Sequence, residues 1–342
     1  MDDHLVKISG PSVAANRWSG AKAALALCIL YANVASAFVY APARLWPNGV
    51  VPFEFDGTVS AEQRTNFLDA MSLWENAFPE VTTVRFRARN GESGFAHLRV
   101  EDPGFEGGRV DHVGYNGGQV TMRIHPNKFS GSRVVGLIAH EFGHVLGLWH
   151  EQSRLDRDEF VSIIRSNIQT FFGFNFNFHI TSPQAFFGPY DYDSIMHYGA
   201  CSFSRCNVDN EDPDCTCGDA DCTTIEVVSR FANQQCDIGQ RRRLSGMDKR
   251  VMAFRYGPSS WKFVYRRLNS TATGSFEQPY PSFSYAITNL PASSTLWLGP
   301  GFHTAAGQVI STPMTLRAAI ADLQMQPDGS IGPSSSGHAI LR

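Results

Sequence analysis

Three histidines at fixed spacing restrict what one short segment of this chain can form. The segment reads HEFGHVLGLWH, with His140 and His144 four residues apart and His150 following after a further six. Histidines four residues apart lie on one face of an α-helix, and the apolar spacing over 132–146 predicts such a helix. Gly147 lets the backbone leave that helix through a left-handed conformation that other residues resist. The segment is therefore expected to form a helix, a turn and a third histidine that returns toward the first two.

This pattern has the chemistry of a catalytic metal site. Three protein ligands with an open fourth position are typical of catalytic zinc, whereas four protein ligands close a structural zinc site. Glu141 lies between the helical histidines, where its carboxylate can act on a water molecule without binding the metal itself. Two histidines on a helix are common by themselves, but five fixed positions make a chance match rare. We expect one zinc ion per chain, held by His140, His144 and His150.

Four stretches of the sequence together resemble one protease family. His140–Asp158, which reads HEFGHVLGLWHEQSRLDRD, is similar to the zinc signature of the astacin family of metzincin endopeptidases. Tyr190–Tyr198 (YDYDSIMHY) resembles the Met-turn of that family with its tyrosine. Leu45–Pro52 (LWPNGVVP) resembles the start of the mature catalytic domain, and Ile238–Tyr256 resembles its end. The resemblance implies an α+β fold, namely a bilobed, zincin-like protease domain with a twisted sheet and an active-site helix.

The resemblance also implies a role for each residue of the catalytic apparatus. His140, His144 and His150 correspond to the zinc ligands, and Glu141 corresponds to the general base that activates water. Tyr198 is similar to the tyrosine that ligates zinc at rest and swings to stabilise the tetrahedral intermediate. The implied activity is hydrolysis of internal peptide bonds, with a protein or peptide as substrate.

Neighbouring residues of the same motifs receive supporting roles or none. Met196 is expected under the zinc site as a packing floor, and Glu151 resembles the carboxylate that receives the mature N-terminus. His197 is not expected to bind zinc. One alternative is another metzincin, which Glu151 and Tyr198 disfavour. A second alternative is a catalytically silent binding or adhesion protein that keeps the fold, which Glu141 and Tyr198 disfavour.

The first residues predict export from the cytoplasm. Positive charges precede an uncharged apolar run at 23–32, which leads to Ala35-Ser36-Ala37, a small-x-small pattern typical of signal peptidase sites. We therefore interpret residues 1–37 as a signal peptide and the protein as secreted. An uncleaved signal anchor is the alternative, and only that alternative implies membrane association. Cleavage after Ala37 leaves no propeptide, so we expect a protease made without a zymogen stage or one restrained from outside the chain.

Cysteine usage agrees with an oxidising compartment. The chain has seven cysteines, and cleavage after residue 37 removes Cys28. The others lie within one window, 201–236, where they predict a local disulfide knot whose pairing the sequence leaves open; they are Cys201, Cys206, Cys215, Cys217, Cys222 and Cys236. Thr83 and Gly257 stand where the family has the two halves of a disulfide, so that bridge is expected to be absent.

The chain is expected to have three regions. These are the signal peptide at 1–37, a catalytic domain at 38–257 that contains the cysteine-rich insertion, and a small β-rich appendage at 258–342, where the sequence turns Ser/Thr/Pro/Gly-rich. The insertion is also rich in aspartate. Calcium is one interpretation, but the insertion lacks EF-hand spacing, so a solvated acidic loop stapled by disulfides is preferred.

Charge and periodicity set the remaining expectations. A formal net charge of −3 argues against a general nucleic-acid binder, which needs a basic face, and we expect a monomer. The apolar spacing predicts a helix over 61–78 and a short strand over 50–55. Pro52 marks that strand as an edge candidate, because proline cannot donate to a sheet ladder. Arg241–Arg243 is predicted to form a solvated or family-typical surface turn.

Overall fold

The computed structural model describes most of the catalytic region and parts of the appendage. It covers residues 39–41, 44–77, 83–169, 178, 185–186, 188–206, 222–264 and 272–299, and short strands at 302–303, 314–318, 323–325, 331–333 and 340–341. The predicted signal peptide and the aspartate-rich part of the insertion lie outside the described residues. Residues 35–258 form one compact unit, and residues from 259 onward belong to another. Within the described part of the chain, no helix is long and apolar enough to cross a membrane.

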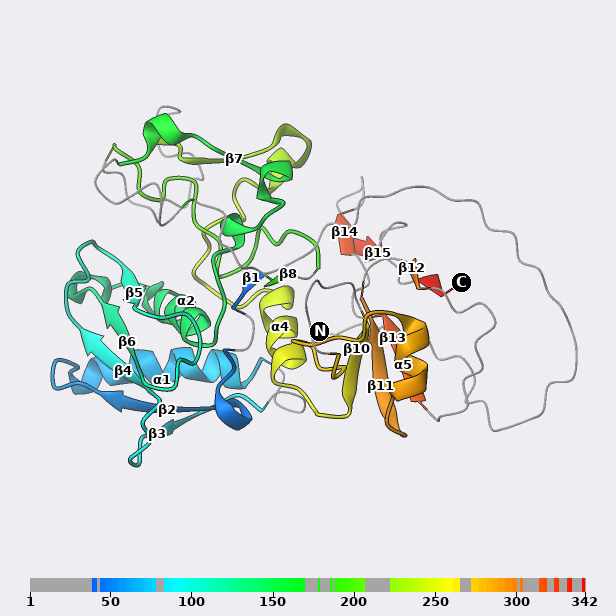
Figure 1. Ribbon diagram of the computed structural model, residues 1–342. Coiled ribbons are helices and arrows are strands. Elements are labelled where there is room, and N and C mark those ends of the chain that lie inside the picture. The colour runs from blue at the N-terminus through cyan, green and yellow to red at the C-terminus, as the bar shows by residue number, and fades with distance from the viewer. Residues whose placement is uncertain are drawn as a thin grey trace, which may run out of the picture. The chain divides into compact units, whose positions relative to one another are not determined.

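A five-stranded sheet forms the first half of the catalytic unit (Figure 1). Its strand order is β3-β2-β4-β6-β5, and only β5 runs antiparallel to its neighbour. The strands are β2 (Val50–Phe55), β3 (Arg85–Ala88), β4 (Phe95–Val100), β5 (Gly108–Val110) and β6 (Gln119–Ile124). The mixed α+β class is confirmed, and the strand predicted at 50–55 is β2.

The edge position predicted for this strand is wrong, because β2 lies between β3 and β4. Even-numbered residues of β2 direct their N–H groups toward β4, as Asp56 does when it donates to the carbonyl of Leu98 at 2.9 Å. The ladder between β2 and β4 begins only at Phe53. The missing N–H of Pro52 therefore falls where β2 has no ladder partner on that side, and an interior strand tolerates the proline.

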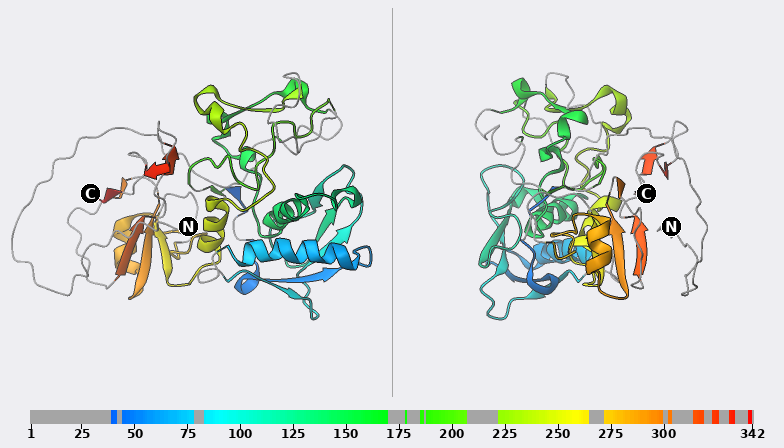
Figure 2. Two further views of the ribbon diagram at one scale, coloured as in Figure 1. Left: turned by 180° about the vertical axis from the view of Figure 1, so that it is seen from behind. Right: turned by 45° about the vertical axis from the view of Figure 1, so that its right-hand side comes forward.

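Two long helices, α1 (Ala61–Glu75) and α2 (Val134–Val145), pack against each other in this half. The views in Figure 2 show them side by side. Ser60 and Gln63 form a capping box that starts α1. Phe67, Met71 and Trp74 are buried as the periodicity predicts, whereas Phe78 lies outside the described residues. The indole N–H of Trp74 donates to the carbonyl of Ala139 at 2.9 Å, which fixes α1 against α2.

The second half of the catalytic unit has little regular structure. Its described residues contain two short antiparallel pairs and one longer helix: β1 (Val39–Tyr40) with β8 (Ala185–Phe186), β7 (Val161–Ile163) with β9 (Ile225–Val227), and α4 (Gly246–Arg255). The short 3-10 helices in the described part of the unit are η1 (Pro47–Gly49), η2 (Pro126–Lys128), η3 (Glu151–Ser153), η4 (Arg157–Glu159), η5 (Arg165–Asn167) and η7 (Ser229–Gln234). A separate apolar core rich in aromatic residues, including Phe160, Tyr192 and Phe178, holds this half together.

The C-terminal unit has its own sheet and its own core. Strands β10 (Trp261–Val264), β11 (Ser294–Leu298) and β13 (Met314–Ala318) are parallel, and α5 (Phe283–Asn289) lies between β10 and β11 in sequence. Two further pairs are β12 (Phe302–His303) with β16 (Ile340–Leu341) and β14 (Leu323–Met325) with β15 (Ile331–Pro333). Phe283, Leu296 and Leu298 belong to the apolar core of this unit.

Candidate active site

The last two turns of α2 are buried on all sides, which is unusual for a helix that carries two histidines and a glutamate. His140, Glu141 and His144 are each less than a tenth exposed. Gly143 is required on this helix because a Cβ there would lie 2.3 Å from the sulfur of Met196. Gly147, with φ of +95°, ends the helix in the left-handed conformation that the sequence predicts.

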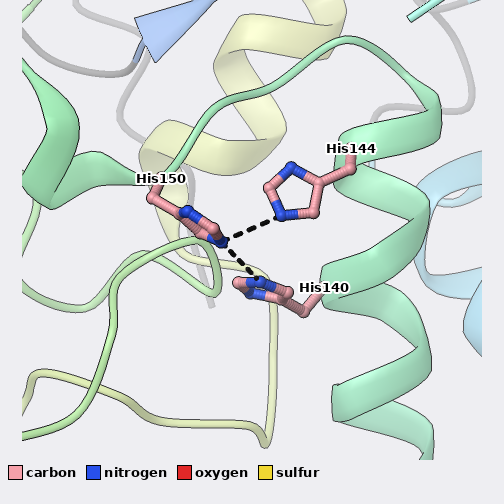
Figure 3. A group of neighbouring side chains, drawn as sticks. All are labelled: His140, His144 and His150. Carbon is pink, nitrogen blue, oxygen red and sulfur yellow. Dashed lines mark hydrogen bonds between the residues drawn. The ribbon is translucent and has the colours of Figure 1, made fainter. Parts of the chain in front are cut away.

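The three predicted ligands converge on one point (Figure 3). Nε2 of His150 lies 3.2 Å from Nε2 of His140 and 3.0 Å from Nε2 of His144. Tetrahedral zinc with bonds of about 2.0–2.1 Å would hold neighbouring nitrogens roughly 3.3 Å apart. The spacing of the three nitrogens therefore fits a single zinc ion with little movement.

Hydrogen bonds fix the tautomers of the two helical histidines. Nδ1 of His140 lies 2.6 Å from the carbonyl of Ile195, and Nδ1 of His144 lies 2.8 Å from the carbonyl of Leu148. A carbonyl only accepts, so each Nδ1 carries the proton and each Nε2 of the neutral ring presents a lone pair. A single proton on His150 could bridge to only one of these lone pairs. The cluster consequently suits a cation that all three nitrogens can bind.

Burial keeps the three rings neutral. Desolvation lowers the pKa of His144 to about 4 and holds the pKa values of His140 and His150 well below their ordinary value. The nearby cation of Arg241 acts in the same direction. Neutral imidazole is the form that binds a metal, so the environment prepares these histidines as ligands.

Glu141 lies beside the histidines with one carboxylate oxygen available. Oε2 is buried and has no hydrogen-bond partner among the described residues. Burial raises the pKa of this carboxyl to about 8, and Arg241 opposes that rise. Gly108 of β5 lies against the side chain, since a Cβ there would be 2.5 Å from Cγ of Glu141. A raised pKa makes the ionised carboxylate a stronger base, and with no protein donor on Oε2 among the described residues this group is suited to exchange a proton with a reactant.

Tyr198 packs against the ring of His150. The two ring centroids are 4.2 Å apart, and the tyrosine is buried. Its backbone N–H donates to the side-chain oxygen of Gln152 at 3.1 Å. Burial, with a smaller effect from Glu141, raises the pKa of the phenol, so the hydroxyl stays protonated and can donate a hydrogen bond.

Met196 and Glu151 connect the segment that carries the histidines to neighbouring parts of the protein. The side chain of Met196 fills the space that Gly143 leaves open on α2, and its carbonyl accepts from the backbone N–H of Glu151 at 3.2 Å. The carboxylate of Glu151 is buried, and its Oε1 accepts from Nη1 of Arg154 and from the backbone N–H of Asp191, both at 3.0 Å. Both residues thus tie the histidine segment to the stretch at 190–198, the predicted Met-turn.

His197 does not belong to the cluster of His140, His144 and His150, which is the one group of side chains among the described residues whose spacing could hold a metal ion. Its Nε2 lies 2.7 Å from the hydroxyl of Tyr190, and its Nδ1 lies 2.6 Å from the carbonyl of Tyr198. Burial lowers the pKa of His197 to about 4. Its two ring nitrogens are therefore occupied within the protein.

The carbonyl end of α2 is held by side chains distant in sequence. The indole N–H of Trp46 donates to the carbonyl of Val145 at 2.7 Å. The guanidinium of Arg255 and the hydroxyl of Tyr256 donate to the carbonyl of Leu146 at 3.0 and 3.2 Å. The last carbonyls of a helix lack partners within the helix, and a cation there also meets the helix dipole favourably. These contacts fix the end of α2, next to the three clustered histidines.

An aromatic contact joins the two halves of the unit near the same site. Phe105, shortly before β5, meets Phe203 with ring centroids 5.8 Å apart, and Phe203 also packs 5.5 Å from Tyr198. The loop that carries Phe203 is stapled by a disulfide between Cys206 and Cys222. Disulfides predicted within the insertion are thereby confirmed for this pair, and Cys201 and Cys236 are also disulfide-bonded.

Comparison with known protein families agrees with this geometry. The family model described as Astacin, a peptidase family, matches residues 38–257. The chain belongs to the astacin family. The resemblance predicted from the sequence motifs is thus confirmed at the level of the family, which the matching model describes as a peptidase family.

Several known proteins are similar in sequence to parts of this chain. Bone morphogenetic protein 1 of Xenopus laevis is 38% identical over 167 residues, which is 48% of this chain and 22% of the relative. Tolloid-like protein 1 of Mus musculus is 33% identical over 249 residues, 71% of this chain and 22% of the relative. This chain therefore spans about a fifth of the length of both. Among solved structures, high choriolytic enzyme 1, a hatching enzyme zinc-protease from Oryzias latipes, is 30% identical, with a TM-score of 0.46 over 61% of this chain and 92% of that chain.

Arg241 is a residue of this astacin whose position the sequence interpretation missed. It was expected in a surface turn, but it is half-buried, and its guanidinium donates to the carbonyls of His197 and Gln240 at 3.1 and 2.8 Å. Its charge lowers the pKa of Glu141 and of all three clustered histidines. Arg242 and Arg243 are exposed and match the expected surface position, and Arg243 pairs with Asp193 at 2.7 Å.

Proposed function

We propose that this chain is a secreted zinc endopeptidase that hydrolyses internal bonds of protein or peptide substrates. The observation that carries the proposal is the convergence of three neutral imidazoles beside a buried glutamate oxygen with no protein partner among the described residues. His140, His144 and His150 would hold the ion through Nε2. When bound, zinc would supply Lewis-acid chemistry at the scissile carbonyl and acidify the attacking water to a pKa of about 7.

Glu141 is the proposed general base. Its Oε2 accepts a proton from the attacking water and then delivers that proton to the nitrogen of the leaving amine. The hydroxyl of Tyr198 donates to the oxygen on which negative charge develops, and burial keeps that hydroxyl protonated. Met196 would serve as the packing floor. We retain for Glu151 the role of receiving the mature N-terminus, and its burial and fixed position suit that role.

An extended peptide can add to the sheet at β5. This strand lies at the end of the strand order, antiparallel to β6, with no second strand partner among the described residues. Edge strands offer unpaired backbone groups that bind an extended peptide as a further strand. Because Gly108 of β5 lies against Glu141, a peptide paired with β5 would bring its backbone next to the proposed base.

The domain boundaries and the compartment are part of the same proposal. We propose that residues 1–37 are a signal peptide, that 38–257 form the catalytic domain with its insertion at 201–236, and that 258–342 form an appendage. The disulfide between Cys206 and Cys222 supports an oxidising compartment. A monomer that acts outside the cell is the expected form.

The test is hydrolysis of casein and of a quenched fluorescent peptide by the purified chain, with zinc content measured in parallel. A zinc chelator should abolish hydrolysis, and added zinc should restore it. Glu141→Ala should bind zinc and hydrolyse neither substrate, whereas Glu62→Ala, an exposed glutamate in α1, should retain full activity. Activity in Glu141→Ala comparable to the wild type would contradict the assignment of the base. A wild type that binds zinc and hydrolyses nothing would favour the silent binding protein.

A further inference from the structure

We propose that Asp248 is a positioning residue for the cluster of His140, His144 and His150. It would act on His140 through the Met-turn. The inference rests on the zinc site of the proposed function. Asp248 lies in the first turn of α4, far from the histidines in sequence, and its side chain is 1% exposed. Its carboxylate accepts hydrogen bonds from the Met-turn and from the start of α4, so its effect on the metal site passes through those residues.

The carboxylate of Asp248 binds the Met-turn at two points. Oδ1 accepts from the hydroxyl of Ser194 at 2.7 Å, and Oδ2 accepts from the backbone N–H of Ile195 at 2.8 Å. The same Oδ2 accepts from the backbone N–H of Ser245 at 2.9 Å. Three donors around one buried carboxylate leave it little freedom to move, and hydrogen bonds to a charged acceptor are stronger than neutral ones.

The Met-turn in turn fixes a metal ligand. The carbonyl of Ile195 accepts from Nδ1 of His140 at 2.6 Å, so the residue that Asp248 holds also carries the group that sets the ring orientation of this histidine. The hydroxyl of Ser194 also accepts from the backbone N–H of Met196 at 3.0 Å, and Met196 packs against Gly143 on α2. Outer partners of this kind orient metal-binding imidazoles and set their affinity.

Helix capping alone does not explain this arrangement. Ser245 and Asp248 form the capping box of α4, and Ser60 and Gln63 form the equivalent box of α1. The box in α1 uses a neutral, half-buried glutamine and serves its own helix. The box in α4 uses a buried carboxylate and directs two of its hydrogen bonds to the Met-turn. A cap would function without those two bonds, which indicates a second role.

The test compares variants by zinc affinity, which is measured by competition with a chromogenic chelator, and by the visible spectrum of the cobalt-substituted protein. Asp248→Ala should weaken zinc binding by about 10- to 100-fold, shift the cobalt spectrum and lower kcat more than KM. Asp248→Asn should recover most of the affinity, because the amide oxygen can still accept from Ile195 and Ser245. Ser194→Ala should show a smaller loss in the same direction. Ser60→Ala, the matched loss of a cap in α1, should leave affinity and spectrum unchanged.

Each outcome decides the proposal. If Asp248→Ala loses thermal stability as Ser60→Ala does but keeps wild-type zinc affinity and cobalt spectrum, Asp248 is a helix cap and the inference is wrong. If Asp248→Ala does not fold, Ser194→Ala and Asp248→Asn decide in its place, and unchanged zinc affinity in Ser194→Ala overturns the inference. A wild type that binds no zinc would overturn the proposed function and this inference together.

Discussion

The ring of Phe203 meets the ring of Phe105 nearly edge-on, with an interplanar angle of 61°. Phe203 follows Tyr198 on a disulfide-stapled loop, and Phe105 shortly precedes the edge strand β5. The backbone of Phe203 has φ of +57°, a conformation that side-chain-bearing residues rarely adopt. The surrounding loop holds it there, as shown by the bond from the backbone N–H of Gln169 to the carbonyl of Phe203 at 2.9 Å. Because Phe105 lies three residues before Gly108 of β5, we expect a peptide that pairs with β5 as proposed to meet this aromatic pair.

Replacing Phe105 by alanine should relax the selectivity of the protease for the substrate residue next to the scissile bond. In Phe105→Ala, Phe203 keeps its packing on Tyr198, so the reaction centre is preserved while the contact across the two halves is lost. The ratio of kcat/KM for a peptide with phenylalanine next to the cleaved bond over one with alanine should rise by about 10-fold. Leu68→Ala, which truncates an exposed apolar residue in α1, serves as the control. An unchanged ratio in Phe105→Ala would show that the pair does not limit access.

Removing the hydroxyl of Tyr198 should slow the chemical step. Tyr198→Phe keeps the ring packed on His150 and Phe203 but loses the proposed donor to the developing oxyanion. We expect kcat to fall by about 100-fold with KM nearly constant. Tyr192→Phe also removes a buried hydroxyl, one that donates to the carbonyl of Phe160 at 3.2 Å in the core of the same half, and it should keep its activity. Steady-state kinetics on a single peptide distinguishes the two variants, and equal kcat values would remove Tyr198 from the mechanism.

Thr83, where the resemblance predicts that a family disulfide is absent, joins its segment to the end of α4 by hydrogen bonds. Its backbone N–H and its hydroxyl both donate to the carbonyl of Tyr256, at 2.8 and 3.0 Å, so the two segments remain joined without a covalent bond. Thr83→Val keeps the shape and loses one of these hydrogen bonds. The free energy of unfolding should fall by about 1 kcal/mol, measured by urea denaturation. Thr65→Val, at an exposed position in α1, should change it little, and a similar loss in both variants would contradict the assignment.

Asp191 should make stability depend on pH. Burial and the neighbouring carboxylates of Asp248 and Glu151 raise its pKa well above the ordinary value, against the hydroxyl of Ser245, which donates to Oδ2 at 2.6 Å. Because the folded state binds this proton more tightly than the unfolded state, the contribution of Asp191 to stability improves as pH falls from neutral toward about 4.

The isosteric variant Asp191→Asn checks the sign of this effect. It should be at least as stable as the wild type at neutral pH, and the difference between the two proteins should shrink as pH approaches about 4. Urea denaturation at a series of pH values provides the measurement. A variant whose stability stays parallel to that of the wild type across this range would show that Asp191 is ionised throughout.

The metal site is the part of this protein that the sequence predicted most closely. Residues at 140–150 encode their own geometry, because helix periodicity sets the spacing of His140 and His144 and a glycine sets the turn. Local backbone rules were sufficient to predict this geometry, and in the structure His150 lies close to His140 and His144. The helix expected over 132–146 and the strand expected over 50–55 followed from equally local patterns.

Tertiary structure alone decided which distant residues serve that site. Pro52 is tolerated in an interior strand because the pairing of β2 with β4 begins one residue after it, at Phe53. The charge of Arg241 acts on the histidines, and its segment packs closely against α2: a Cβ at Gly136 would lie 1.8 Å from the carbonyl oxygen of Arg241. The contacts of Asp248 with Ser194 and of Arg255 with Leu146 join segments more than fifty residues apart. Hydrogen bonds of this kind depend on the path of the whole chain, and no periodicity within a segment encodes them.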